Sequence, residues 1–247
     1  MLENELETRW DNNINKDFVV QDNSLIRSAY TMPLNTKRLF LLATSKINSM
    51  NFAGINTCIG VTVSAEEWNK LYGGTNVWKE LKLATQDLMK RHLMVCPLDK
   101  KYQRVINFCD SVDYYHRESR CEIRFSYSIS KMLAGMLDEF TKVDLLNVAK
   151  FDSKHSVRVY ELLNQMKNTN EQWWLRIGLD EFRACMGLSD RQYQRFAELK
   201  RTVITPSINE INSKSDLSVE VEYLKRGRKI DSLHFRFKPC DQMFIEW

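Results

Sequence analysis

The sequence predicts an α+β protein built from two tandem copies of one small domain. A stretch within each half repeats at a constant offset, helical patterns surround each repeat in the same order, and each half ends in strands with alternating apolar and polar residues. Alternation with period two indicates a strand with one buried face. At 247 residues the chain is long enough for two domains of about 100 to 130 residues each.

The internal repeat aligns residues 63–73 with residues 177–187, an offset of 114 residues counted from 63 to 177. The matched pairs are Val63 and Ile177, Glu67 and Glu181, Trp68 and Phe182, and Gly73 and Gly187. Upstream, Ile59 and Val61 align with Trp173 and Leu175. Each copy is therefore expected to form a short strand and a short helix that ends at a glycine, which predicts two domains of one fold.

In the first copy, a helical pattern over residues 35–48 precedes the repeat and a second helix is expected over residues 77–92. Two strands joined by a polar tip are then expected between residues 102 and 126. The tip carries Arg117 and Arg120 around a glutamate.

The second copy has the same order, with helices over residues 156–167 and 192–212 and a hairpin over residues 217–238. Gly227 can supply the positive φ that a tight hairpin turn needs. Helix, strand, helix, helix, strand, wing and strand is the order of a winged helix-turn-helix. In that fold the third helix enters the major groove of DNA, and the tip of the wing lies over the adjacent backbone.

The third helix of the second copy can be projected at about 100° per residue. The apolar face collects Phe196, Leu199, Val203, Ile204, Ile208 and Ile211. The outward face collects Glu198, Arg201, Thr202, Thr205, Asn209 and Asn212, with Arg195 at the border. Arginine suits guanine edges, asparagine adenine, and threonine a phosphate or a thymine methyl. An ordinary solvated helix face is the alternative interpretation.

Two residues qualify this projection. Lys200 projects toward the core side of the helix. Pro206 removes the hydrogen bond to the Thr202 carbonyl, so we expect a kink there and base reading by the N-terminal half of the helix.

Four cations surround the expected turn of the C-terminal wing. They are Lys225, Arg226, Arg228 and Lys229. On DNA such cations contact phosphates, whereas without DNA they are a solvated hairpin tip that blunts the strand edges. In the first copy, Lys79, Lys82, Lys90 and Arg91 on the third helix and the two arginines of the tip are candidates for auxiliary backbone contact, or for solvation alone.

Composition supports a globular protein with a localised basic region. The formal net charge is +4, with 43% hydrophobic and 28% charged residues. Nine Lys or Arg against five Asp or Glu lie between residues 191 and 229, which accounts for the whole excess. No apolar run approaches the roughly 20 residues that span a bilayer, and the polar start of the chain lacks the apolar region of a signal peptide. Six cysteines without a C-x-x-C pair suggest reduced thiols. We expect a cytoplasmic protein with no membrane partner.

Enzymes that nick DNA or hydrolyse nucleotides need patterns that the chain does not contain. Its histidines are isolated, so no His-x-His metal pair forms by local spacing, and there is no GxxxxGK[ST] loop. Carboxylate pairs such as Glu66-Glu67 and Asp180-Glu181 fall in the first turns of helices, where they complement the helix dipole. We expect no catalytic residues, no metal and no cofactor.

Three stretches closely resemble the replication initiator (Rep) proteins of iteron-containing bacterial plasmids. They are residues 24–47, 140–165 and 196–237, and the similarity covers nearly the whole chain from about Ser24 to Pro239. The most specific piece is an S-x-R-x-Y-E-L-L run, here Ser156, Arg158, Tyr160, Glu161, Leu162 and Leu163; "LKR-x-V" and "INEIN" in the third helix also match.

The resemblance implies two winged helices that bind direct repeats at a plasmid origin as monomers, help to open the adjacent AT-rich duplex, and recruit the host replication initiator and the replicative helicase. It also implies self-association through the N-terminal domain, with some dimers repressing their own promoter. It further implies that Arg195, Lys200, Arg201 and the wing at residues 226–229 contact DNA.

The expected organisation is therefore a polar tail (1–21), an N-terminal winged helix for dimerisation and auxiliary DNA contact (22–127), a helical connector (128–152), a C-terminal winged helix for sequence-specific binding (153–239) and a tail (240–247). The expected DNA-binding set is Arg195, Lys200, Arg201, Thr202, Thr205, Asn209, Lys225, Arg226, Arg228 and Lys229, with Lys79, Lys82, Arg117 and Arg120 as auxiliaries.

Two other functions remain open at this point. A transcriptional repressor without origin activity would use the same groove contacts. A nuclease or topoisomerase-like replication enzyme would show metal-dependent nicking of origin DNA. Direct repeats of about two helical turns beside the encoding gene would favour the initiator, and a lone inverted repeat over its promoter would favour the repressor.

Overall fold

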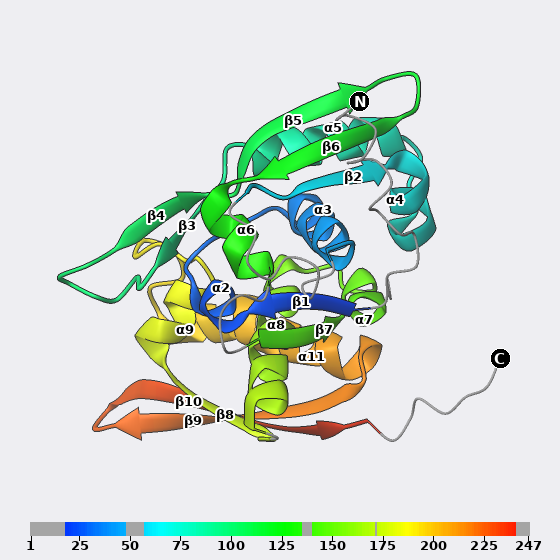
Figure 1. The fold of residues 1–247 in the computed structure, drawn as a ribbon. Helices are drawn as coiled ribbons and strands as arrows, with labels where there is room; N and C mark the ends of the chain where they lie inside the picture. The colour runs from blue at the N-terminus through cyan, green and yellow to red at the C-terminus, as the bar shows by residue number, and fades with distance from the viewer. Residues whose placement is uncertain (1–17, 48–56, 135–139, 171, 241–247) are drawn as a thin grey trace.

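The computed structural model describes residues 18–47, 57–134, 140–170 and 172–240. Two domains lie one above the other in Figure 1. Each has a three-stranded antiparallel sheet packed against helices, and a two-stranded sheet lies between them. Residues 1–17 and 241–247 of the two expected tails lie outside the described part of the chain.

The N-terminal domain is the upper one in Figure 1. Its elements are α3 (Leu34–Ser45), β2 (Gly60–Ser64), α4 (Ala65–Tyr72), α5 (Val77–Leu88), β5 (Cys109–Tyr115) and β6 (Arg120–Phe125), with strand order β2-β6-β5. The start of α4 is a capping box, in which Ser64 accepts from the amide of Glu67 and the Glu67 carboxylate accepts from the amide of Ser64. Gly73, with a φ of +66°, ends this helix.

The C-terminal domain repeats this plan. Its elements are α8 (Lys154–Asn170), β8 (Trp174–Gly178), α9 (Leu179–Cys185), α10 (Phe196–Leu199), η2 (Lys200–Ile204), α11 (Thr205–Lys214), β9 (Leu217–Arg226) and β10 (Lys229–Pro239), with strand order β8-β10-β9. Strand β8 and helix α9 begin 114 residues after β2 and α4, the offset of the sequence repeat. Two tandem winged helices are therefore confirmed.

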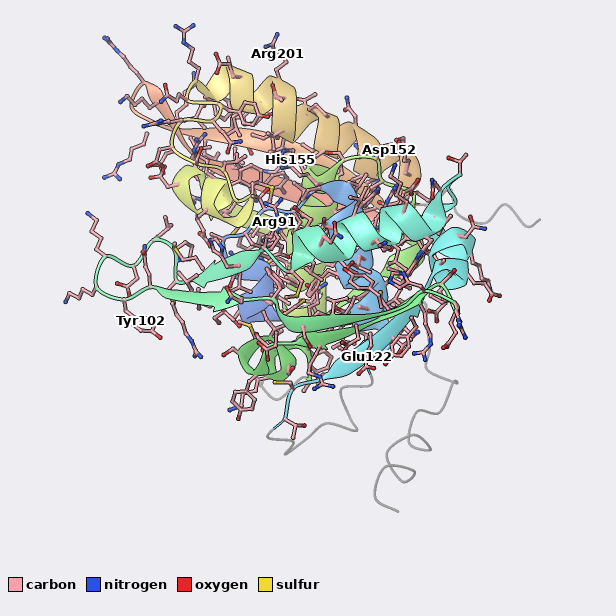
Figure 2. The ribbon with its side chains drawn as sticks, turned by 90° about the horizontal axis from the view of Figure 1, so that it is seen from above. Arg91, Tyr102, Glu122, Asp152, His155 and Arg201 are labelled. Carbon is pink, nitrogen blue, oxygen red and sulfur yellow. The ribbon has the colours of Figure 1, made fainter. Side chains whose placement is uncertain are left out.

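A hairpin that the sequence did not predict separates α5 from the N-terminal wing. It consists of β3 (His92–Val95) and β4 (Arg104–Asn107), which pair with each other and not with the domain sheet. We expected a single hairpin between residues 102 and 126, and this was wrong, because β4 pairs backward with β3 and the wing proper is β5 with β6. The hairpin projects from the body of the protein in both views (Figures 1 and 2).

The segment between the domains is not the purely helical connector that we expected. It contains α6 (Tyr127–Leu133), β7 (Phe140–Asp144) and α7 (Leu145–Ala149), and β7 pairs antiparallel with β1 (Phe18–Asp22). Residues 18–21 of the expected polar tail are thus a strand. The pairing follows from alternation, because Val19 and Gln21 on β1, like Thr141 and Val143 on β7, are fully buried.

Helix α2 (Asn23–Arg27) follows β1, and the two domains meet around a buried group of charges. Glu161 of α8 lies 2.7 Å from Lys37 Nζ of α3 and 2.9 Å from Arg158 Nη1. Burial alone would raise the pKa of Glu161, but the two cations hold it below its usual value. Arg158 also donates to the main-chain oxygens of Ile26 and Cys185. The Glu161 carboxylate and the Arg158 guanidinium thus bind elements of both domains.

No helix in the described ranges is long and apolar enough to cross a membrane. Within the same ranges, no three His, Cys, Asp or Glu residues are grouped so as to hold a metal ion. The six cysteines, all in the described part of the chain, are free thiols.

Candidate nucleic-acid interface

The third helix of the C-terminal domain, which we call the reading helix (residues 196–214), contains a π-helical turn. Elements α10, η2 and α11 follow one another without a break, and the amide of Thr205 donates to the carbonyl of Lys200, five residues back. Pro206 stands directly after this turn, at the start of α11. Because proline has no amide to bond the Thr202 carbonyl, the expected irregularity occurs as a wider turn before the proline.

The π turn corrects the expected orientation of Lys200. Leu199 is buried, as the projection at a constant 100° per residue predicts, but Lys200 is exposed and does not project toward the core. A π turn inserts about one extra residue into the helix, which shifts the angular position of everything before it. Val203 and Ile204 are adjacent and both buried. Val203 is the last buried residue of the apolar face before the π turn ends, and Ile204 is the first of the apolar face that continues along α11.

The remaining candidates on the reading helix divide into free and engaged side chains. The exposed candidates are Arg195, Lys200, Arg201, Thr202 and Asn209. Figure 2 shows Arg201 on the outer side of the helix, pointing away from the body of the protein. Thr205 is half-buried and hydrogen-bonded to the phenol of Tyr223. Asn212 is exposed, as expected for the outward face, but its amide is engaged by two bonds to the main chain of Val219 on β9 (2.6 and 3.0 Å).

The C-terminal wing presents its cations at the tip, as the sequence predicts. Arg226 and Lys229 are the last paired residues of β9 and β10, and Gly227 turns the chain with a φ of +66°. All four tip cations are exposed. Further along the hairpin, Glu222 forms an ion pair with Arg236 at 3.3 Å. Among the described residues, no carboxylate lies within 4 Å of the tip cations. The tip is therefore a compact patch of unneutralised positive charge.

Tyr223 joins the wing to the reading helix. Its ring lies edge to face with Phe196, with centroids 5.2 Å apart, and the Lys200 ammonium lies 4.7 Å from its centroid. Together with the bond to Thr205, these contacts hold β9 against three successive turns of the helix. The reading helix and the wing thus form one rigid cationic surface. The sequence did not predict this link, because its alternating pattern identifies Tyr223 only as a residue of a strand.

The turn before the reading helix is held by Arg183 of α9. Its guanidinium donates to the main-chain oxygens of Ser189, Gln192 and Tyr193, at 3.1, 2.6 and 2.9 Å. Gly187 lies at the start of this turn with a φ of +64°, and a Cβ there would lie 2.2 Å from the carbonyl oxygen of Tyr30. Only glycine allows this approach, so the turn is fixed against the N-terminal domain.

The auxiliary candidates of the N-terminal domain are less available. Lys79 on α5 and Arg117 at the wing tip are exposed. Lys82 is half-buried, with its ammonium 6.0 Å from the Trp78 ring. Arg120 is bonded to Glu118 and lies 3.8 Å over the ring of Tyr115. Of the two wing tips, both within the described ranges, only the C-terminal one keeps all its cations unpaired.

Comparison with known proteins gives matches along most of the chain. Residues 18–164 match the family model described as "Initiator Replication protein, WH1", and residues 178–237 match "Initiator Rep protein, WH2". A "Replication initiation protein" of Escherichia coli is 31% identical over 172 residues, 68% of this chain and 52% of that relative, so the match spans about half the relative's length. An "Uncharacterized 27.6 kDa protein" of Escherichia coli is 23% identical over 239 residues, 90% of this chain and 95% of that protein.

Among solved structures, the "Crystal structure of Pi initiator protein in complex with iteron DNA" superposes with a TM-score of 0.73. The superposition covers 92% of this chain and 98% of that one, at 20% sequence identity. At this identity the likeness concerns the arrangement of the two winged helices.

Proposed function

The chain belongs to the replication initiator (Rep) family of plasmids, and from that premise we propose that it binds direct repeats at a plasmid origin as a sequence-specific, non-enzymatic initiator. The observation that carries the proposal is the rigid surface formed by the reading helix and the C-terminal wing. A helix with free cationic and amide side chains, held beside a cluster of unneutralised cations, is suited to a major groove and the phosphates next to it. The superposed Pi initiator, which was crystallised in complex with iteron DNA, supports this assignment.

The exposed side chains of this surface divide into two roles. Arg201 and Asn209, both exposed, are proposed to read base edges, because a guanidinium or an amide forms paired hydrogen bonds with guanine or adenine. Arg195, Lys200, Thr202 and the four wing cations hold the phosphate backbone. The Thr205 hydroxyl is hydrogen-bonded to Tyr223, so we propose that Thr205 holds the wing in place and does not contact DNA.

The N-terminal domain is proposed to add backbone contacts and self-association. Lys79 and Arg117 are its best exposed auxiliary cations, while Lys82 and Arg120 are held by aromatic rings. Exposed apolar side chains for a partner copy lie on the β3–β4 hairpin, where Leu98, Tyr102 and Val105 are more than half exposed. The apolar residues of the N-terminal wing are less available for a partner copy, as Phe108, Ile123 and Phe125 are fully buried.

The later steps of initiation complete the proposal. Bound at the origin, the protein would help to open the adjacent AT-rich duplex and recruit the host initiator and the replicative helicase in the cytoplasm. As a dimer it would repress its own promoter. These roles are supported by membership of the family.

A footprint on the cognate plasmid tests the proposed function. Protection of direct repeats, one protein per repeat, supports an origin-binding initiator. Protection of a single inverted repeat over the promoter, with none at direct repeats, would identify a repressor instead. Incubation of supercoiled origin DNA with Mg²⁺ completes the test, since nicking by the purified protein would reveal an enzyme.

A further inference from the structure

A groove of about 760 Å³ runs between the two domains. One wall comes from the α5–β3 turn, with Lys90, Arg91 and His92, and the other from α9 and the turn that follows it. The α2–α3 loop, with Thr31, lies between them. In Figure 2, Arg91 and His155 both lie between α5 and the reading helix, at the junction of the two domains.

A lysine at this junction has no carboxylate partner among the described residues and bonds to Thr31, which lines the groove together with Arg91. Lys154, the first residue of α8, donates to the Thr31 hydroxyl at 3.1 Å, and no carboxylate in the described ranges lies within 4 Å of its ammonium. Burial, and then the charge of Arg91, lower the pKa of Lys154. A half-buried ammonium that lacks a carboxylate partner would be stabilised by a bound anion.

The acidic groups nearby are already engaged or lie on the other wall. Asp87 accepts from Arg91 Nε at 3.0 Å and from the Thr36 hydroxyl at 2.7 Å. Glu210 lies 2.9 Å from Lys214 Nζ, and Asp152 also binds that lysine. Asp180 and Asp190 line the far wall beside Arg183. Arg91 is thus paired with Asp87, whereas Lys154 has no carboxylate partner among the described residues.

We propose that Lys154, assisted by Arg91, binds a phosphodiester of the DNA backbone that crosses the junction between the two domains. The inference rests on the proposed function and adds a contact that belongs to neither winged helix alone. In Figure 2 the reading helix and α5 lie on either side of His155, the residue that follows Lys154, so a duplex that touches both helices would pass its backbone over this junction. The phosphate would screen Lys154 from Arg91 and so favour the observed arrangement of the domains.

The test is the salt dependence of binding by the full-length chain, with Lys154→Met as the variant. Loss of one phosphate contact should make the slope of log K against log salt shallower by about 0.9 and weaken binding roughly fivefold to tenfold at about 0.1 M salt, equally for all sequences. Lys131→Met is the matched control, because it removes an exposed cation from α6, on the opposite side of the protein from the reading helix in Figure 2. Lys154→Arg should retain the contact.

Ethylation interference on a single direct repeat locates the phosphate. The wild-type protein should be sensitive to ethylation at a phosphate between the two grooves that the domains touch, and Lys154→Met should lose that sensitivity alone. An unchanged slope and pattern in Lys154→Met, with a shallower slope in a wing variant such as Arg226→Ala/Arg228→Ala, would overturn the inference and leave the proposed function standing. Failure of the wild-type chain to bind direct repeats would instead overturn the proposed function. Melting temperatures of all variants show whether a loss reflects folding.

Discussion

The ammonium of Lys200 lies 4.7 Å from the ring centroid of Tyr223, so a cation of the reading helix rests on a strand of the wing. The contact exists because the π turn moves Lys200 out of the core and toward β9. Two parts of the proposed DNA surface that are more than twenty residues apart in sequence are thereby held at a fixed distance. This contact and four other features of the protein can each be tested by substitution.

Tyr223→Ala should separate the wing from the helix. The ring contact with Phe196, the cation–π contact with Lys200 and the bond to Thr205 together suggest a loss of about 2 to 3 kcal/mol in the free energy of unfolding. Tyr223→Phe keeps the ring and should lose only about 1 kcal/mol. Denaturant titration measures both, and equal losses in the two variants would mean that the ring contributes nothing.

Replacing Arg226 and Arg228 by Ala should weaken binding to every DNA sequence alike. Each lost phosphate contact should make the slope of log K against log salt shallower by about 0.9. The measurement is a salt titration on one direct repeat and on unrelated DNA. If slope and affinity are both unchanged, the tip is only a solvated hairpin end.

Arg201→Ala should cost about 1 to 3 kcal/mol of binding and relax the preference at one or two base positions. Its exposed, outward position leaves the guanidinium free for a guanine edge. Binding to a panel of singly substituted repeats measures the effect. A uniform loss over the panel would assign Arg201 to the backbone.

Lys37→Met should destabilise the protein by about 3 to 5 kcal/mol, because Glu161 would remain buried with one cation fewer. Lys46→Met, at the C-terminal end of the same helix, is the control, since its pair with Glu67 is partly exposed and should contribute about 0 to 1 kcal/mol. Urea unfolding compares the two. Similar losses would show that the buried pair is not a principal support of the domain junction.

His155 should make stability fall as the pH drops below about 6.5. Burial, and then Lys154, lower the pKa of His155 from 6.5 to about 4, so between these values the unfolded chain takes up a proton that the folded chain does not. Stability therefore rises with pH across this window. His155→Asn should flatten the profile between pH 4 and 6.5, measured by thermal unfolding. If the stability of His155→Asn still falls as steeply between pH 6.5 and 4, the pH dependence comes from carboxylates and not from His155.

Much of the fold could be predicted because the sequence contains an internal repeat of one domain. The repeat of residues 63–73 at 177–187 gave the offset at which β2 and β8 begin, and alternation outlined both wings. The π turn was also visible in principle, since two apolar series meet at the adjacent residues Val203 and Ile204. A constant 100° projection concealed it.

Other features depend on contacts that local patterns do not encode. The pairing of β1 with β7 joins segments on either side of a whole domain, and the β3–β4 hairpin has an exposed tip that makes no pairing with the domain sheet. Arg158 and Glu161 of the S-x-R-x-Y-E-L-L run gave no sign of their role, which is to tie α8 to Lys37 and Tyr30 of the other domain. Long-range charge pairing of this kind becomes visible only when the chain is folded.

The pairing of β1 with β7 also orders events while the chain is being made. Strand β1 leaves the ribosome early, but its partner, residues 140–144, follows more than a hundred residues later. At about 5 to 20 residues per second, β1 waits for roughly 6 to 25 seconds. The β2-β6-β5 sheet can form once Phe125 has emerged, so the nascent N-terminal domain passes through a period with an unpaired first strand. Val19, buried in the finished protein, is then open to chaperones.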